Sequence, residues 1–215
     1  MNDSETELRA RVKRIIEVLK QEYPGAKCTL DFSTPHQLLV AAILAAQCTD
    51  EKVNQLTPAL FERYPDVNAF ASADVNELEE MVRPTGFFRN KSKAIIASAK
   101  EIVASYGGVV PDDIDQLTAL PGVGRKTANL IVGVAYGQPA IIVDTHVKRV
   151  ANRLGLTSND DPDKIEADLR GIVPTQDATL FNHLIVAHGR AVCKAPKPLC
   201  EICVLLELCP YGTKA

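Results

Sequence analysis

Apolar residues recur at helical spacing along almost the whole chain. The first such face consists of Leu8, Val12, Ile15, Ile16 and Leu19. Residues 38–46 are apolar on every side, which predicts a helix buried in the middle of the core. The spacing predicts further helices near residues 53–61, 75–82 and 94–103, and others up to Cys193. Only residues 140–143 resemble a strand, and because four residues cannot make a sheet, the predicted fold class is all-α.

Prolines and glycines separate these helical segments. Clear breaks occur at Pro84-Thr85-Gly86, at Gly107-Gly108 and at residues 121–124. There is no internal repeat and no flexible linker. If the chain forms two lobes, it must therefore pass between them through tight turns.

The composition is that of a soluble globular protein of 215 residues with a formal net charge of −3. Residues 1–5 lack the basic and apolar regions of a signal peptide, and the longest apolar run, residues 38–46, is far shorter than the ~20 residues of a membrane span. We therefore expect a cytoplasmic protein that does not enter a membrane, acting as a monomer.

The charges are unevenly distributed, which leaves a basic face for nucleic acid possible despite the acidic total. Residues 187–200 contain Arg190, Lys194 and Lys197 and no acid. Residues 81–100 are also free of acids and contain five bases, Arg83, Arg89, Lys91, Lys93 and Lys100. Such runs are more often ordinary solvated surfaces.

The segment 120–127 reads Leu-Pro-Gly-Val-Gly-Arg-Lys-Thr. Gly122 and Gly124 flank Val123 and allow a sharp turn between two helices through positive φ. A helix is predicted from Arg125 to about Val134, and its first backbone N–H groups have no partner within the helix. Because the helix dipole makes this end positive, the turn can bind an anion such as a DNA phosphate. An ordinary corner between two helices explains the glycines equally well.

Lys126 lies in the first turn of this helix, where the dipole disfavours a charged amine. A neutral lysine is a nucleophile, so the position suits amine catalysis. The simpler interpretation is a surface lysine that contacts phosphate.

Asp144 precedes another predicted helix, where aspartate is a favoured N-cap. The same position favours an ionised carboxylate, which could stabilise a cation. Sequence alone does not tell whether the amine and the carboxylate meet.

Four of the six cysteines lie within the last 23 residues: Cys193, Cys200, Cys203 and Cys209. Structural zinc sites usually contain two closely spaced pairs, and here only Cys200 and Cys203 form one. Four thiolates this close together favour an iron–sulfur cubane, with zinc as the alternative. Lys194 and Lys197 lie between the first two cysteines and could contact a DNA backbone. Cys28 and Cys48 fall outside the pattern and are interpreted as buried small apolar residues.

Three motifs together resemble the endonuclease III family of helix-hairpin-helix DNA glycosylases and apurinic/apyrimidinic lyases. They are the segment 120–129, the sequence Val-Asp-Thr-His-Val at 143–147, and the cysteine spacing of six, two and five residues. The resemblance covers residues 15–209. It implies a six-helix domain at 28–138 and a discontinuous domain, 1–27 with 139–215, which carries a [4Fe–4S] cluster on its loop 193–209. Double-stranded DNA would lie in a cleft between these two lobes.

The resemblance also implies a chemistry. Lys126 would attack C1′ of a flipped nucleotide and displace an oxidised pyrimidine such as thymine glycol. The Schiff base, which also forms at abasic sites, would then lose the 3′ phosphate by β-elimination, with Asp144 stabilising the cationic sugar. Gln47 matches the residue that fills the gap left by the base. Phe87 falls where the family often has a leucine wedge, so the preferred substrate or partner base can differ.

Three other functions remain as alternatives. A monofunctional glycosylase of the same superfamily, such as an adenine-mismatch enzyme, would have another residue in place of Lys126. A helix-hairpin-helix module that only binds DNA would need neither Lys126 with Asp144 nor a cluster. A redox carrier would require an electron partner.

Three of the residues named above also have simpler interpretations. Gln47 could be a buried amide that closes a helix, and Phe87 could be an ordinary core residue. His146 could have a role in helix structure.

Overall fold

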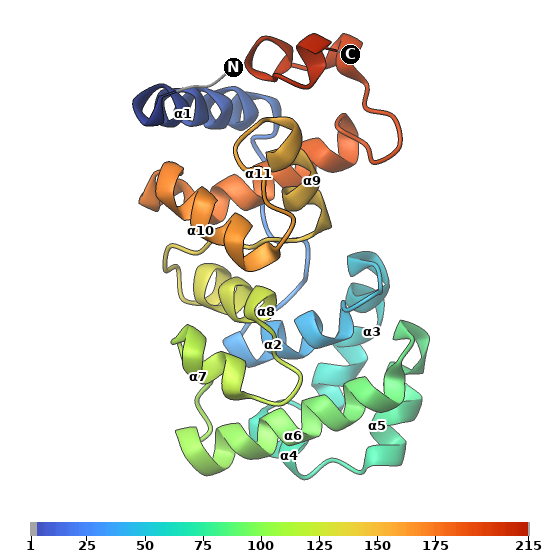
Figure 1. The fold of residues 1–215 in the computed structure, drawn as a ribbon. Coiled ribbons are helices and arrows are strands. Elements are labelled where there is room, and N and C mark those ends of the chain that lie inside the picture. Colours follow the sequence, from blue (N-terminus) through green and yellow to red (C-terminus); the bar gives the residue numbers. More distant parts are fainter. Residues whose placement is uncertain (1–3, 215) are drawn as a thin grey trace. The chain divides into compact units, whose positions relative to one another are not determined.

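The computed structural model describes residues 4–214, and no strand is formed within them (Figure 1). The all-α prediction is confirmed. Residues 1–3, part of the stretch used to argue against a signal peptide, lie outside the described residues. The helical elements are α1 (Glu5–Glu22), α2 (Pro35–Leu44), α3 (Asp50–Arg63), α4 (Val67–Ala71), α5 (Val75–Val82), η1 (Arg83–Thr85), α6 (Phe88–Tyr106), α7 (Ile114–Ala119), α8 (Arg125–Leu130), η2 (Ile131–Ala135), α9 (Thr145–Arg153), α10 (Pro162–Ile172), η3 (Thr175–Asp177), α11 (Ala178–Ala191), η4 (Cys200–Ile202), η5 (Leu206–Leu208) and η6 (Gly212–Lys214).

The chain divides into two compact units. Unit 1 comprises Met1–Lys27 with Gln138–Ala215, and unit 2 comprises Cys28–Gly137. The resemblance placed Gln138 at the end of the domain 28–138, whereas the structure places it in unit 1. Its carbonyl accepts a hydrogen bond from the Thr179 hydroxyl at 3.4 Å. Among residues 4–214, no helix combines the length and apolar character needed to cross a bilayer.

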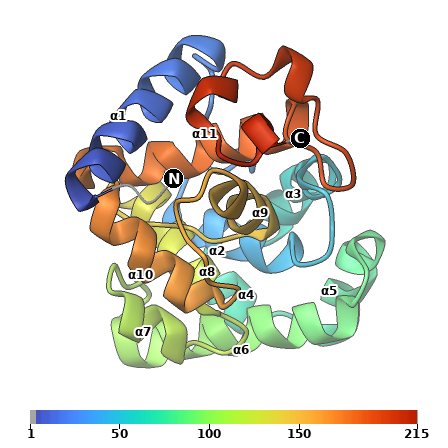
Figure 2. The same ribbon diagram turned by 45° about the horizontal axis from the view of Figure 1, so that its top comes forward.

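Unit 1 is built on α1, α9, α10 and α11, and α11 packs against both α1 and α9 (Figure 2). The first helix begins at a capping box, because the Glu7 N–H donates to the Ser4 hydroxyl and the Ser4 N–H donates to the Glu7 carboxylate. The apolar face predicted for this helix is buried from Val12 onward, with Val12, Ile15 and Leu19 fully inside, and Leu8 is partly buried. These side chains share one core with apolar residues of α9, α10 and α11.

Unit 2 is arranged around α2, which packs against α3, α6, α8 and η2. The helix starts at Thr34, whose hydroxyl accepts from the Gln37 N–H at 3.2 Å, and Pro35 is its first residue. Leu38, Leu39 and Leu44 are at most 1% exposed, so the predicted central helix is confirmed. The α-helices of unit 2 include the five-residue α4, which the apolar pattern did not predict.

Candidate functional site

The segment 120–127 forms a hairpin in unit 2 that joins α7 to α8. Gly122 has φ +77°, and a Cβ added to it would lie 2.5 Å from the Cβ of Ala94. Only glycine therefore lets the hairpin approach α6 this closely. Gly124 differs from the prediction, because its φ of −91° is accessible to any residue and an added Cβ would face open space. Gly124 is the N-cap of α8, and no side chain caps this helix start.

Lys126 is the second residue of α8, and its side chain is exposed, as is that of Arg125. The predicted helix over 125–134 is confirmed, although it continues after Leu130 as the wider π-helical η2. Val123 is only 6% exposed, and its N–H donates to the Leu120 carbonyl at 3.1 Å. The valine side chain thus anchors the turn, while the exposed part of the hairpin is formed by its glycines and the first residues of α8.

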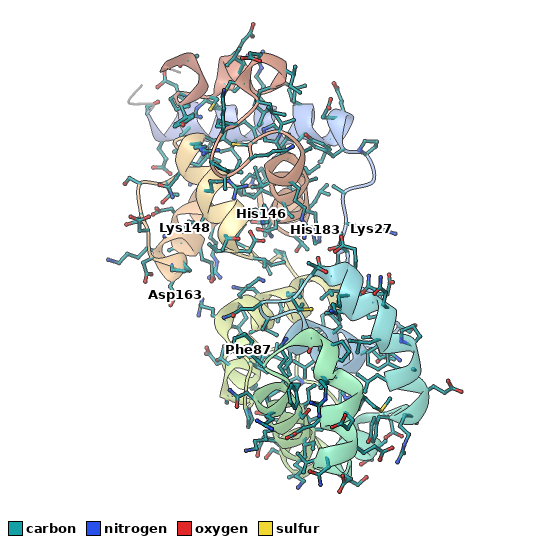
Figure 3. All side chains as sticks on the ribbon, turned by 90° about the vertical axis from the view of Figure 1, so that its right-hand side faces the viewer. Lys27, Phe87, His146, Lys148, Asp163 and His183 are labelled. Carbon is teal, nitrogen blue, oxygen red and sulfur yellow. The ribbon has the colours of Figure 1, made fainter. Side chains whose placement is uncertain are left out.

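Gln47 and Phe87, both in unit 2, are exposed residues in left-handed backbone conformations. Their φ values are +54° and +48°, and within residues 4–214 no other non-glycine residue has a positive φ. Phe87 is 62% exposed at the start of α6 (Figure 3), so the core interpretation of this residue is wrong. Gln47 is likewise exposed, which excludes a buried amide that closes a helix.

The basic run over residues 81–100 does not form a continuous basic surface. Arg83 is paired with Glu80, and the Nε of Arg89 lies 3.8 Å from an oxygen of Glu79. Lys91 is only 5% exposed. Glu79 and Glu80, from the preceding helix α5, therefore offset much of this positive charge. The sequence pattern did not reveal this, because both acids lie just before residue 81.

In unit 1, Asp144 is the N-cap of α9. One of its carboxylate oxygens accepts from the Val147 N–H at 2.7 Å, and the other lies 3.3 Å from Nδ1 of His146. The capping interpretation of Asp144 is confirmed, and so is a structural role for His146, which lies in the first turn of α9 (Figure 3). The Asp144 side chain remains 21% exposed. A fixed carboxylate that is still open to solvent can face a cationic ligand.

The extended residues before Asp144 explain the strand-like pattern at 140–143. Ala140, Ile141 and Ile142 are nearly fully buried, but no neighbouring strand pairs with them in the described structure. The buried side chain of Asn182 takes that place: its oxygen accepts from the Ile142 N–H at 2.9 Å, and its amide donates to the Ala140 carbonyl at 3.0 Å. Asn182 thereby fixes the approach of the chain to Asp144, a role that the sequence did not indicate.

The four C-terminal cysteines line one pocket of unit 1 together with apolar side chains of α9 and the loop. Burial raises the pKa of the Cys203 thiol, and the charges of the other three cysteines raise it further. Four thiolates in this pocket would thus need positive charge between them. In the part of the chain that the structure describes, no three potential ligands converge closely enough to hold a single metal ion. Cys28 and Cys48 are half-buried, not buried as the sequence suggested.

Protein N–H donors are directed at two sulfurs of this pocket. The Arg153 guanidinium donates to the Cys193 Sγ, and the Gly212 N–H donates to the Cys209 Sγ, both at 3.4 Å. The Cys209 Sγ also lies 3.5 Å from the Arg153 carbonyl, and the Cys203 Sγ lies 3.6 Å from the His188 Nε2. The donor set therefore fits a group bound through four thiolates, because N–H groups directed at sulfur stabilise its negative charge.

Arg153 also holds the loop between the first two cysteines. Its guanidinium donates to the carbonyls of Lys194 at 2.7 Å and Ala195 at 2.8 Å, and it stacks over the Tyr211 ring at 5.0 Å. The side chains of Lys194 and Lys197 are exposed on this loop. The cysteine pocket and the basic loop are thus one connected structure. Arg153 was missed in the sequence because its position on a helix carries no sign of these distant contacts.

Comparisons with known proteins agree with these motifs. Residues 40–175 match the family model described as the HhH-GPD superfamily base excision DNA repair protein. The chain is 54% identical over 201 residues to an endonuclease III from Synechocystis sp., covering 93% of this chain and 92% of the relative. The chain belongs to the endonuclease III family. An endonuclease III from Bacillus subtilis is 42% identical over 95% of this chain and 94% of its own.

Solved structures of the endonuclease III family share this fold. The match to a trapped endonuclease III–DNA covalent intermediate, an estranged-adenine complex, has a TM-score of 0.90 and 40% identity and covers 96% of this chain and 97% of that chain. The chain is thus an enzyme of base excision repair, a DNA glycosylase and apurinic/apyrimidinic lyase that binds DNA. Lys126 belongs to unit 2 and Asp144 to unit 1.

Proposed function

We propose that this endonuclease III homologue removes oxidised pyrimidines, thymine glycol being a typical example, from double-stranded DNA and then cleaves the strand through a Schiff base on Lys126. The observation that carries the proposal is the exposed amine of Lys126 in the first turn of a helix that no side chain caps. A protein 40% identical to this chain has been trapped as a covalent intermediate with DNA, which supports an enzyme-bound nucleophile here.

The proposed covalent steps use the amine of Lys126 and one molecule of water. The Lys126 nitrogen attacks C1′ of the flipped nucleotide, the bond from C1′ to the base breaks, and the base leaves with a proton. Ring opening of the sugar gives the protonated imine. Loss of a proton from C2′ then expels the 3′ phosphate by β-elimination, and water releases Lys126 from the sugar. An abasic site enters the same sequence at its aldehyde.

In this proposal, Asp144 stabilises the positive charge that develops on the sugar. Its carboxylate is held by the Val147 N–H and by the His146 ring, so it needs no reorganisation when the charge appears. The arrangement requires that Asp144 and Lys126 face the same nucleotide when DNA is bound.

The DNA contacts proposed for the hairpin, Gln47 and Phe87 follow from their exposure. Gly122, Val123, Gly124 and Arg125 form the turn that would meet a phosphate at the uncapped start of α8. The Val123 N–H already donates to the Leu120 carbonyl, so Val123 would shape this turn rather than donate to the phosphate. Gln47 would fill the gap left by the flipped nucleotide, and the exposed ring of Phe87 would stack on the orphaned partner base. Phenylalanine offers a flat aromatic face for stacking, which the leucine often found in the family lacks.

We further propose that Cys193, Cys200, Cys203 and Cys209 hold a [4Fe–4S] cluster. A single zinc ion draws its ligands in to about 2.3 Å, whereas the four irons of a cubane each take one thiolate and keep the ligands further apart. The presence of all four cysteines in the lining of one pocket, with N–H donors directed at two of their sulfurs, supports a group bound through thiolates. The cluster's contribution would be structural: it would hold the loop from which Lys194 and Lys197 reach the DNA backbone.

Borohydride trapping tests the nucleophile directly. Wild-type enzyme is incubated with a duplex that carries one thymine glycol, the imine is reduced, and covalent adducts are separated by denaturing electrophoresis. An adduct is expected from the wild type and from Lys100→Ala, in which an exposed lysine of the same unit is removed. No adduct is expected from Lys126→Ala.

The other outcomes discriminate between the alternatives. A folded, cluster-loaded wild type that releases the base without forming an adduct would indicate a monofunctional glycosylase. Neither release nor adduct would indicate a module that only binds DNA. An adduct that persists in Lys126→Ala would retain the lyase but assign its amine to another residue. Analytical ultracentrifugation of the bound complex tests the proposed monomer.

A further inference from the structure

Lys91 is a buried ammonium group in α6 of unit 2. Its Nζ donates one hydrogen bond to the Leu44 carbonyl and another to the Thr85 carbonyl, both at 2.8 Å. Burial lowers the pKa of Lys91, while the nearby Cys48 acts in the opposite direction. No carboxylate of the described residues forms an ion pair with this amine. Because a buried charge is costly unless its donors are satisfied, the two carbonyls are essential to this arrangement.

Both carbonyls lie at the ends of helical elements. Leu44 is the last residue of α2, and Thr85 is the last residue of η1. Carbonyls at such ends lack partners within the helix, and at the end of the ten-residue α2 the helix dipole also favours a cation. One ammonium group therefore donates hydrogen bonds to the terminal carbonyls of two helical elements, and these carbonyls lie 41 residues apart in the sequence.

The chain leaving these two ends carries the two exposed residues proposed to enter DNA. Gln47 follows Leu44 by three residues, and Phe87 follows Thr85 by two. Both are in the left-handed region, which is unfavourable for a non-glycine residue and persists only where the surroundings enforce it. The backbone N–H of Lys91 also donates to the Phe87 carbonyl at 3.1 Å. That bond is an ordinary backbone bond of α6, whereas the two bonds of the Nζ, one to each segment, depend on the lysine side chain.

We propose that Lys91 is a positioning residue that locks the Gln47 and Phe87 segments together, so that both side chains enter the damaged duplex as one preformed unit. The inference rests on the proposed function, in which Gln47 fills the gap and Phe87 meets the orphaned base. Lys91 itself is too buried to contact DNA. Its effect is transmitted through Leu44 and Thr85, and the basic run in which it occurs hides this role.

This proposal predicts an effect restricted to duplex DNA that contains a lesion. Undamaged duplex offers no gap, and a single strand has no partner base, so neither needs the two segments in register. Recognition of an abasic site in a duplex needs both. A purely structural lysine would instead affect all DNA substrates alike.

The test compares Lys91→Met with Lys93→Met, an exposed lysine two residues along the same helix. Affinity is measured for a duplex containing a tetrahydrofuran abasic analogue and for the undamaged duplex. Lyase rates are measured on an abasic site in a duplex and in a single strand. For Lys91→Met we expect the preference for the abasic duplex to fall about tenfold, the duplex lyase rate to fall similarly and the single-strand rate to be unchanged. Lys93→Met should match the wild type.

A mutant cycle separates this inference from the function on which it rests. In a Gln47→Ala/Phe87→Ala background, Lys91→Met should lower the preference no further, since the segments it positions carry no inserting side chain. If the background double variant binds like the wild type, the proposed roles of Gln47 and Phe87 are wrong, and the inference fails with them. Two results would overturn only the inference, given that the Gln47→Ala/Phe87→Ala variant loses its preference for the abasic duplex. In the first, adding Lys91→Met to that variant lowers the preference further by its full effect. In the second, Lys91→Met slows the lyase reaction on single-stranded DNA as much as on the duplex.

A second variant covers the case in which Lys91→Met does not fold. Lys91→Gln keeps a side-chain N–H donor, but its side chain is one atom shorter than that of lysine, so its amide should not reach the Leu44 and Thr85 carbonyls together. The same loss confined to the lesion-containing duplex is expected. Wild-type preference in a folded Lys91→Gln would overturn the proposal.

Discussion

The carboxylate of Asp144 accepts a hydrogen bond from the backbone N–H of Val147 at 2.7 Å, so the residue proposed to stabilise the sugar cation is also the cap of a helix. As the N-cap, Asp144 begins α9, whose buried face belongs to the core of unit 1. As an ionised group, it is the proposed stabiliser of the sugar cation. The first function needs an oxygen acceptor at this position, whereas the second needs a negative charge, so the two can be separated by substitution.

Asp144→Asn should retain the fold and lose the chemistry. Asparagine caps helices as well as aspartate does, so the unfolding free energy should change little. The excision rate under single-turnover conditions should fall by about 10²-fold, because the charge that stabilises the cation is gone. Asp144→Ala should lose activity and also about 1 kcal/mol of stability.

Asp161 provides the matched control for this pair. It caps α10 in the same unit by accepting from the N–H groups of Asp163 and Lys164. Asp161→Ala should therefore cost about 1 kcal/mol of stability and leave the excision rate intact. An Asp144→Asn enzyme as fast as the wild type would remove Asp144 from the reaction.

The two hairpin glycines should respond differently to the same added methyl group. Gly122→Ala should destabilise unit 2 by about 2 kcal/mol, because its Cβ would overlap Ala94 and its φ is positive. Gly124→Ala should change stability by less than about 0.5 kcal/mol, since the added methyl group faces open space. Urea denaturation measures both values. Equal losses of stability would show that the two positions are not distinguished by conformation and space.

The sequence predicted the helices well because helical periodicity is a local property. The buried α2 was found from the order of apolar residues, and the helix beginning at Arg125 from the turn of prolines and glycines before it. Asp144 as an N-cap was likewise predictable, since capping depends on residues within one turn. The family motifs added Gln47 and Phe87, which neither periodicity nor charge would have selected.

Contacts between distant segments could not be predicted in this way. Lys91 belongs to a basic run, and only the fold shows that its amine lies inside and bonds to Leu44. The strand-like residues 140–143 are extended because Asn182, some 40 residues later, supplies their hydrogen bonds. Both cases depend on a side chain reaching backbone groups far along the chain, for which a single sequence carries no signal.

The cysteine pocket gives a prediction that does not depend on activity. Cys203→Ser should lose most of its bound iron and acid-labile sulfide, because one of four thiolate ligands is removed. Cys48→Ser, which changes a half-buried cysteine of unit 2, should retain both. Elemental analysis of the purified proteins decides the point. Stoichiometric zinc without iron in the wild type would replace the cubane with a zinc site.

His36 should make the enzyme less stable in acid. Its ring is buried against Phe70, with the ring centroids 5.1 Å apart, and burial lowers the pKa of His36 to about 4, although Asp66 opposes this shift. In the unfolded chain the pKa is near 6.5. Between about pH 6.5 and pH 4, the unfolded chain therefore binds a proton that the folded protein excludes. Stability should fall over this range by up to about 3 kcal/mol, with no further loss from His36 below it.

A His36→Leu variant isolates this effect. The pKa values of His183 and His188 are also lowered by burial, but their contributions are the same in both proteins and cancel in the comparison. The unfolding free energies of wild type and variant, measured by urea denaturation at intervals from pH 7.5 to pH 4, should therefore diverge as the pH falls, the wild type losing more. Parallel curves would mean that the folded protein accommodates a charged His36, because the buried ring would then bind its proton as readily as the unfolded chain does.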